Sequence, residues 1–207
     1  STKLAIKTAL DGSMMPIYST FNGGGGLLTS NVVVENSPAL SKVADALKMN
    51  QYKKMILDKV NITFDIVDGK IFVKPFDFKL NNTLANVQGT SGFDQTINYV
   101  MGLTIPRADF GGAANNVLSG MVSQANAKGA NVLVGDMVKT DVLITGTTLD
   151  PKISLGLKGA GGDVASSLQN QAQAEIDKKK QEALNKAQAE ADKLKADAEA
   201  KVRAETD

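Results

Sequence analysis

The chain has 207 residues, and its 23 Lys and Arg residues balance 22 Asp and Glu residues to a formal net charge of +1. A charge this close to zero gives no electrostatic footprint for nucleic acid, so we expect no nucleic-acid partner. The absence of Cys and His excludes disulfides, thiolate metal sites and every catalytic arrangement built on those two residue types. Carboxylate-only and Ser–Lys chemistry stay open, but no motif marks either. We therefore predict no enzyme activity, no catalytic residue, no metal and no cofactor.

The sequence predicts no membrane-spanning helix, because no run of about 18 apolar residues occurs in it. The N-terminus, Ser1 to Leu4, is followed by no apolar stretch of signal-peptide length, and the chain has no initiator Met. We interpret the chain as a processed or excised fragment. Any targeting segment or membrane anchor is then expected in a missing N-terminal part.

The first predicted strand covers residues 26–35 and follows a run of four glycines at 23–26. That run lacks the Gly-Lys-Ser/Thr ending of a phosphate-binding loop and precedes a strand, so we interpret it as a flexible turn. A short helix comes next, with Ser37 as its N-cap and Pro38 as its first residue. One face of this helix would consist of Leu40, Val43, Ala44 and Leu47.

The clearest strand pattern covers residues 60–66, where the apolar side chains occupy the even positions. Asp68-Gly69 then indicates a tight hairpin, and its second strand covers residues 71–80. Pro75 cannot donate a hydrogen bond to a ladder, so we expect an edge or a bulge at that point.

Further strands are predicted at residues 85–93, 97–105, 139–147 and 152–158. A helix over about residues 110–127, which Gly129 would end, separates the first two from the last two. The short connections favour an antiparallel meander over crossover units. The predicted fold class is α+β, with a curved, groove-like antiparallel β-meander sheet, two short amphipathic helices and a long C-terminal helix.

The composition of the chain changes at 159–162, a glycine-rich stretch that we interpret as a hinge. From Asp163 onward there is no Gly and no Pro, and the helix-forming residues Ala, Gln, Glu, Lys and Leu predominate. We therefore predict two domains, a β-groove domain over residues 1–160 and a long helical tail over residues 161–207.

Small apolar residues recur every 11 positions in the tail, which is typical of a nearly straight stripe along one helix. Two interpretations of this stripe stay open: a solvated single helix, and a surface for a partner helix or for self-association. A membrane-surface helix is less favoured, because the tail is net negative and has few large apolar side chains. The stripe consists of Ala165, Ala172, Ile176, Ala183, Ala187, Leu194 and Ala198.

Several motifs follow one another in the main part of the chain: the strand that ends in Asn36 with the helix after it, the hairpin of residues 57–71, and residues 75–78, 89–94, 97–106 and 146–153. In this order the motifs resemble the C-terminal region of the AsmA family, envelope proteins of Gram-negative bacteria. The resemblance covers roughly residues 20–158 and does not include the tail.

This resemblance implies the end module of a long periplasmic β-groove that is anchored in the inner membrane and is related to bridge-like lipid-transfer proteins. The expected role is to bind or conduct phospholipid between the inner and outer membranes and to support outer-membrane assembly. The expected partners are phospholipid or other acyl chains. The alternative is a structural or docking module whose helical tail binds a protein partner or self-associates.

The apolar face of the predicted strands has two interpretations, a core covered by the two helices or, in part, an open groove. Two short helices leave apolar surface uncovered on a sheet of about eight strands, and such surface needs another partner. The family offers no catalytic motif, so we take the candidate groove residues from strand parity alone. They are Ile62, Phe64, Ile66, Phe76, Phe78, Leu80, Tyr99, Met101, Leu103 and Ile105.

Overall fold

In the computed structural model, the described residues are 1–157, 174, 177–178, 181–182, 185 and 189. The chain divides into two units, Ser1–Asn170 and Gln171–Asp207. Every strand and helix treated below belongs to the first unit. The boundary predicted between residues 160 and 161, the continuous tail helix and every residue of its apolar stripe lie outside the described residues.

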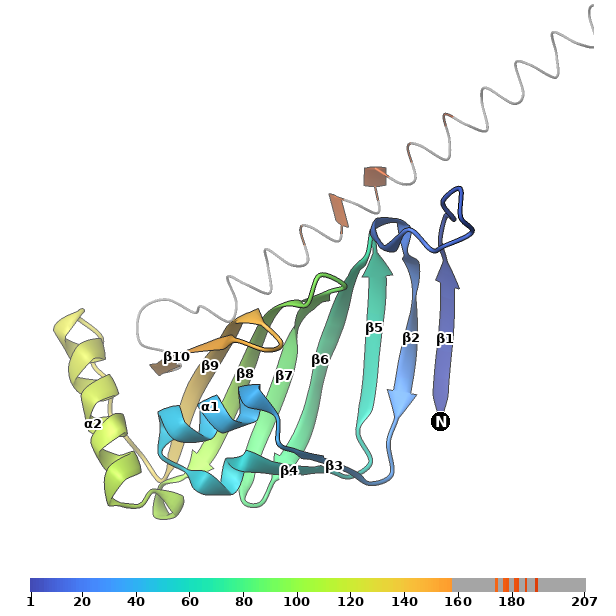
Figure 1. Cartoon of the computed structure of the whole chain (residues 1–207). Coiled ribbons are helices and arrows are strands. Elements are labelled where there is room, and N and C mark those ends of the chain that lie inside the picture. Colours follow the sequence, from blue (N-terminus) through green and yellow to red (C-terminus); the bar gives the residue numbers. More distant parts are fainter. Residues whose placement is uncertain (158–173, 175–176, 179–180, 183–184, 186–188, 190–207) are drawn as a thin grey trace, which may run out of the picture. The chain divides into compact units, whose positions relative to one another are not determined.

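Eight antiparallel strands form the main sheet in the order β1-β2-β5-β6-β7-β8-β9-β10 (Figure 1). Their bounds are β1 Thr2–Lys7, β2 Asn22–Leu28, β5 Asn61–Val67, β6 Lys70–Leu80, β7 Thr83–Gly92, β8 Thr96–Pro106, β9 Met137–Thr147 and β10 Pro151–Leu157. From β5 to β10 each strand pairs with the next one in the chain, as the predicted meander requires. The ladder between β6 and β7 shifts register between Val73 and Phe76, which confirms the irregularity predicted at Pro75.

Two helices and a small second sheet complete the described fold. The chain passes from β2 through β3 (Val32–Glu35), α1 (Pro38–Leu47) and β4 (Lys54–Leu57) before it enters β5, and α2 (Gly112–Ala127) connects β8 to β9. Ser37 caps α1 as predicted, because its hydroxyl accepts a hydrogen bond from the Leu40 N–H at 3.4 Å. The fold class is thus α+β with a mostly antiparallel sheet and two helices, and the expected curvature of the sheet stays a prediction.

The glycine run at 23–26 belongs to strand β2, so the flexible turn predicted there is wrong. Its backbone pairs with β1 on one side and with β5 on the other, and this double pairing holds it extended. At Gly25 an added Cβ would run into the carbonyl oxygen of Lys3 on the neighbouring strand β1. Close approach of the neighbouring backbone therefore accounts for glycine at this position.

The strand predicted over 26–35 is two strands that belong to different sheets, β2 and β3. The break lies at Thr29, a buried residue whose side chain and backbone both bond to Val60. The Thr29 N–H donates to the Val60 carbonyl at 2.9 Å, and the Val60 N–H donates to the Thr29 hydroxyl at 3.2 Å. These bonds hold the end of β2 beside the start of β5, and the chain then leaves the main sheet and continues into β3.

The hydrophobic core lies on one side of the main sheet, between the strands and α1. Val43, Ala44 and Leu47 of α1 are buried against Leu103 of β8 and Val142 of β9. Figure 1 shows α1 in front of the strands on the β7 to β10 side. Neither α1 nor α2 lies in front of β1, β2 and β5.

Candidate functional site

The strand register places all the candidate groove residues on one face of the sheet, which we call the apolar face. Residues directly opposite one another in an antiparallel ladder share a face. One row runs from Phe64 through Val73 and Gly89 to Tyr99, and the next contains Phe76, Val87 and Met101. Strand alternation assigns the remaining candidates to the same side, which is also the side covered by α1.

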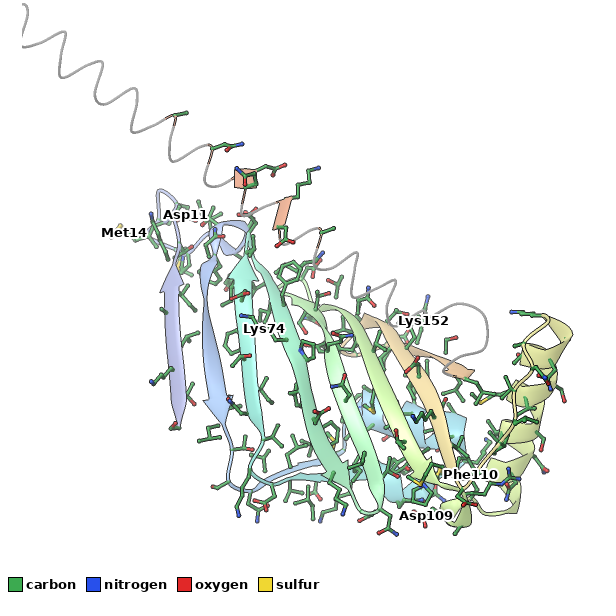
Figure 2. All side chains as sticks on the ribbon, turned by 180° about the vertical axis from the view of Figure 1, so that it is seen from behind. Asp11, Met14, Lys74, Asp109, Phe110 and Lys152 are labelled. Carbon is green, nitrogen blue, oxygen red and sulfur yellow. The ribbon has the colours of Figure 1, made fainter. Side chains whose placement is uncertain are left out.

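The opposite face carries charged and polar side chains, and we call it the polar face. The Lys74 ammonium lies 3.3 Å from the Asp65 carboxylate, and the Asn86 side chain donates to Asp77 at 2.7 Å. Figure 2 views this face and labels Lys74 and Lys152 on it, with α1 on the far side. The charged side chains thus lie on the polar face, although this face also holds the buried apolar residues Phe72 and Val100.

The candidates divide by how much protein covers them. Ile62, Phe76 and Tyr99 are partly buried and pack against the edge of the core, while Phe64 is partly buried and Ile66 is buried. An acyl chain could reach the fully covered candidates only by displacing α1 and the segments beside it. The covered candidates in the core cluster, each at most 7% exposed, are Phe78, Leu80, Met101, Leu103 and Ile105, whereas Ile66, which is 3% exposed, is covered outside that cluster.

The uncovered part of the apolar face lies at β1 and β2, where the sequence analysis proposed no site residue. Leu4 of β1 is 57% exposed, Ile6 is 46% exposed and Leu27 of β2 is 37% exposed. Register places Leu4 in one row with Gly25 and Phe64, and Ile6 in one row with Ile66. The alternation of Leu4 and Ile6 with Lys3 and Lys7 is a strand signal that could have revealed β1.

Aromatic rings lie against glycines on this face and give it a flat floor. A Cβ added to Gly25 would come within 3.0 Å of the Phe64 ring, and one added to Gly89 would come within 2.6 Å of the Tyr99 ring. The Tyr99 hydroxyl shares a hydrogen bond of 2.9 Å with Ser91, and burial raises the pKa of Tyr99. The floor is thus apolar, and the tyrosine hydroxyl within it has a partner.

The space between α2 and the sheet is closed. The cavity there has a volume of only about 10 Å³. It is lined by side chains of α2 and of the sheet, among them Leu118 and Val138. That volume is too small for an acyl chain, so we restrict the candidate site to the β1, β2 and β5 part of the face.

Depressions on the polar face lie where glycine replaces a side chain. One of about 530 Å³ surrounds Gly24 and Gly26. Another of about 490 Å³ surrounds Gly102 and is lined by Asp77, Asn86 and Lys139 among others. The charged walls of the second depression do not suit an apolar chain. The first depression lies on the polar face, with Lys3 and Asn61 in its lining, so neither belongs to the candidate site on the apolar face.

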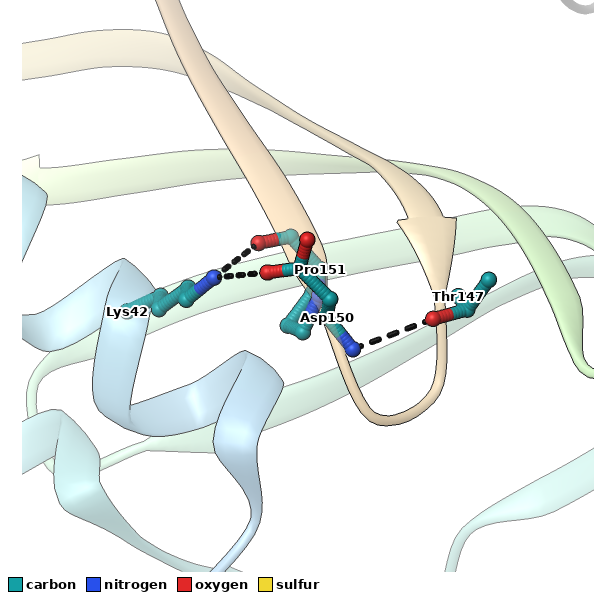
Figure 3. A network of polar contacts seen from close by, with 4 residues as sticks. All are labelled: Lys42, Thr147, Asp150 and Pro151. Atoms are coloured by element: carbon teal, nitrogen blue, oxygen red, sulfur yellow. Dashed lines mark hydrogen bonds and ion pairs between the residues drawn. The ribbon is translucent and has the colours of Figure 1, made fainter.

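A polar contact anchors α1 over the covered part of the face. The Lys42 ammonium donates to the Asp150 carboxylate at 2.7 Å and to the Pro151 carbonyl at 2.7 Å (Figure 3). Asp150 also donates its backbone N–H to the Thr147 hydroxyl at 3.0 Å. The hydrogen bond and charge of Lys42 lower the pKa of Asp150. Helix α1 is thus tied to the turn between β9 and β10.

A second polar contact lies inside the core. The Tyr52 and Thr83 hydroxyls share a buried hydrogen bond of 2.6 Å. Burial raises the pKa of Tyr52. This bond connects the segment after α1 to the start of β7, so it holds the cover of the apolar face in place.

Comparison with protein-family models, curated proteins and solved structures finds no significant match for this chain. The resemblance to the AsmA family therefore stays a prediction that rests on the motifs. None of the helices in the described part of the chain combines the length and the apolar character that crossing a bilayer requires.

Proposed function

We propose that the open part of the apolar face binds the acyl chains of phospholipid. The observation that carries this proposal is the exposure of Leu4, Ile6 and Leu27 on the same face that forms the core elsewhere. Covering large apolar side chains removes their surface from water, which favours binding by about 25 cal/mol for each Å². A flat sheet floor offers such cover to a long apolar chain along its whole length.

The dimensions of the open part suit a chain-like ligand. Adjacent strands in a sheet lie about 4.8 Å apart, so the span from β1 to β6 is about 14 Å. At Gly25 of β2 the Phe64 ring lies where a side chain would be, so the surface between Leu4 and Phe64 is a flat apolar floor. Curvature of the sheet, which we propose as well, would make this floor into a groove.

The wider role proposed for the chain is that of a non-enzymatic end module in the cell envelope. In this role the chain forms the end of a periplasmic β-groove that is anchored to the inner membrane. The groove carries phospholipid between the inner and outer membranes and supports outer-membrane assembly. The ordered motifs that resemble the AsmA family support this role, and so does a sequence without His or Cys.

Native mass spectrometry of the purified chain, before and after mild organic extraction, tests the proposal. We expect extra mass that matches phospholipid and disappears on extraction. A chain that carries no extractable mass, even after incubation with phospholipid vesicles, would contradict lipid binding.

A matched pair of variants assigns the binding to a face. Leu4 on the apolar face and Leu84 on the polar face are both leucines with 57% exposure. Leu4→Glu should lower the retained lipid several-fold, because it places a charge on the apolar floor, whereas Leu84→Glu should leave the retained lipid unchanged. Circular dichroism checks that both variants fold. An equal loss of retained lipid in both variants, or no loss in either variant, would contradict the assignment to the apolar face.

A further inference from the structure

The loop between β1 and β2, residues 8–21, carries a second exposed apolar surface. Met14 is 75% exposed and Met15 is 59% exposed, and Leu10 and Tyr18 are exposed beside them. In Figure 2 Met14 points away from the sheet at the outer end of this loop. Asp11 is the only charged residue in it. The loop therefore presents an apolar tip.

The turn of this loop satisfies its polar groups internally. The Asp11 carboxylate accepts hydrogen bonds from the N–H groups of Ser13 and Met15 at 2.8 and 2.9 Å. The Asp11 N–H donates to the Met15 carbonyl at 2.9 Å, and the Met14 N–H donates to the Asp11 carbonyl at 3.0 Å. Backbone that enters hydrocarbon has to be satisfied in this way, since no water is there to bond to it.

The base of the loop is held in the same manner. The Thr8 and Thr20 hydroxyls share a hydrogen bond of 2.9 Å, and the Ile17 N–H donates to the Ala9 carbonyl at 3.0 Å. The Tyr18 ring stacks on Phe93, with ring centroids 5.7 Å apart. The tip is thus carried on an ordered stem.

Methionine at position 14 does not suit the backbone there. Its φ of +62° lies in the left-handed region, which Gly and Asn adopt far more readily. A turn chosen for its geometry alone would place one of those residues at this point. Lys48, Lys59 and Gln95 adopt the same backbone region, so the conformation alone does not identify a contact. Met14 differs from them because the side chain that it presents to solvent is long, flexible and apolar, and is 75% exposed.

The charges beside the tip suit a zwitterionic surface. Lys7, at the end of β1, lies next to the loop and forms no ion pair with any described residue. Asp11 in the loop and Asp68 and Asp94 at the neighbouring turns carry negative charge, so both signs are present. Lysines and tyrosines prefer the headgroup region of a bilayer, where Tyr18 would place its hydroxyl.

We infer that this loop docks the protein on the surface of a lipid bilayer. Met14 and Met15 insert between the acyl chains, while Lys7 and Tyr18 contact the headgroups. A projecting tip fits a deformable bilayer better than a protein pocket, because nothing around it forms a complementary wall. The inference rests on the proposed function and deepens it: the loop follows Leu4 and Ile6 directly, so an acyl chain could pass from the bilayer to the open face.

A single tryptophan reports on insertion, because the chain contains no Trp. Met14→Trp should shift its fluorescence to shorter wavelength when vesicles of phosphatidylcholine with a minor fraction of phosphatidylglycerol are added. Brominated acyl chains in those vesicles should quench it. Leu84→Trp, on the polar face near the opposite end of the sheet, should show neither the shift nor the quenching. Insertion would be contradicted if Met14→Trp does not respond, or if both reporters respond alike.

A polar variant measures what the methionines contribute. Met14→Asn with Met15→Gln removes both apolar side chains, and Asn accepts the left-handed backbone, so the fold should be kept. Vesicle co-sedimentation should fall about tenfold. Unchanged co-sedimentation would overturn the inference, and so would a Met14→Trp shift that appears without vesicles as protein concentration rises.

The same variant separates the two proposals. Its lipid retention in native mass spectrometry should match that of the parent chain, since the apolar floor at Leu4 is untouched. Loss of vesicle binding with lipid retained supports both proposals. Vesicle binding by a chain that retains no lipid would contradict the proposed function and leave the docking of the loop standing.

Discussion

The two parts of the apolar face have the same chemistry and different neighbours. Over β7 to β10, apolar side chains such as Leu103 and Val142 meet α1 and are buried. Over β1, β2 and β5, side chains such as Leu4 and Ile6 continue the same rows and are exposed. Strand parity thus decides which face a residue occupies, while the connections between strands decide whether that face is core or surface.

The largest expected contrast is in stability, between a leucine of each part. Leu103→Ala empties a fully covered site and should lower the free energy of unfolding by about 2 to 5 kcal/mol. Leu4→Ala removes a side chain that is already half in water, and it should cost only about 0.5 kcal/mol. Urea unfolding of both variants measures the difference. Equal costs would mean that the two parts are equally covered, and would remove the basis for an open site.

A smaller effect tests the segment after α1, which helps to cover the apolar face. Tyr52→Phe leaves the Thr83 hydroxyl buried without its partner, which should cost about 1 to 3 kcal/mol in urea unfolding. Leu84→Ala, on the exposed polar face, serves as the control and should change little. A neutral Tyr52→Phe would show that the segment after α1 does not depend on this bond.

Alkaline pH should loosen the same cover. Burial raises the pKa of Tyr52 and of Tyr99 above the ordinary value of 10.0. The unfolded chain therefore ionises first, so this contribution to stability is complete below about pH 10 and is lost as pH rises through the folded-state pKa values. Tyr52→Phe should weaken the alkaline fall. A pH profile that is identical in the variant would contradict the part assigned to Tyr52.

The smallest effect concerns the anchor of α1. Lys42→Met removes the ion pair with Asp150, an exposed contact whose loss should hardly change global stability. The pKa of Asp150 should rise toward its ordinary value, and amide exchange in α1 should become faster. The lowered pKa in the parent chain means that this contact acts above the carboxyl's ordinary pKa and is lost as pH falls through the folded-state value. An unchanged Asp150 titration by NMR would show that the contact is not formed in solution.

Sequence patterns predicted the strongly alternating strands, both helices and the cap at Ser37, because each depends on local residue types. They missed β1 and mistook the glycine run for a turn. Glycines 23–26 have no side chains to alternate, and they are extended only because β1 and β5 hold them on both sides. Such pairing is a property of the folded sheet and cannot be recognised from the sequence of the glycine run.

The candidate site was predictable to the level of the face. Parity grouped Phe64 with Phe78 correctly, as the register shows. It could not tell that Phe78 lies in the core cluster with α1 residues while Phe64 lies beside the open β1 and β2. That distinction depends on where α1 lies, and α1 is placed by contacts distant in sequence, such as Lys42 with Asp150.

The most direct test of the open face is photo-crosslinking with a phospholipid that carries a diazirine in its acyl chain, followed by peptide mapping. We expect crosslinks on β1, β2 and β5, at residues such as Leu4, Ile6 and Phe64. We expect none on the polar face at Leu84 or Lys74. Crosslinks spread equally over both faces, or confined to the polar face, would contradict the claim that the uncovered part of the apolar face holds lipid.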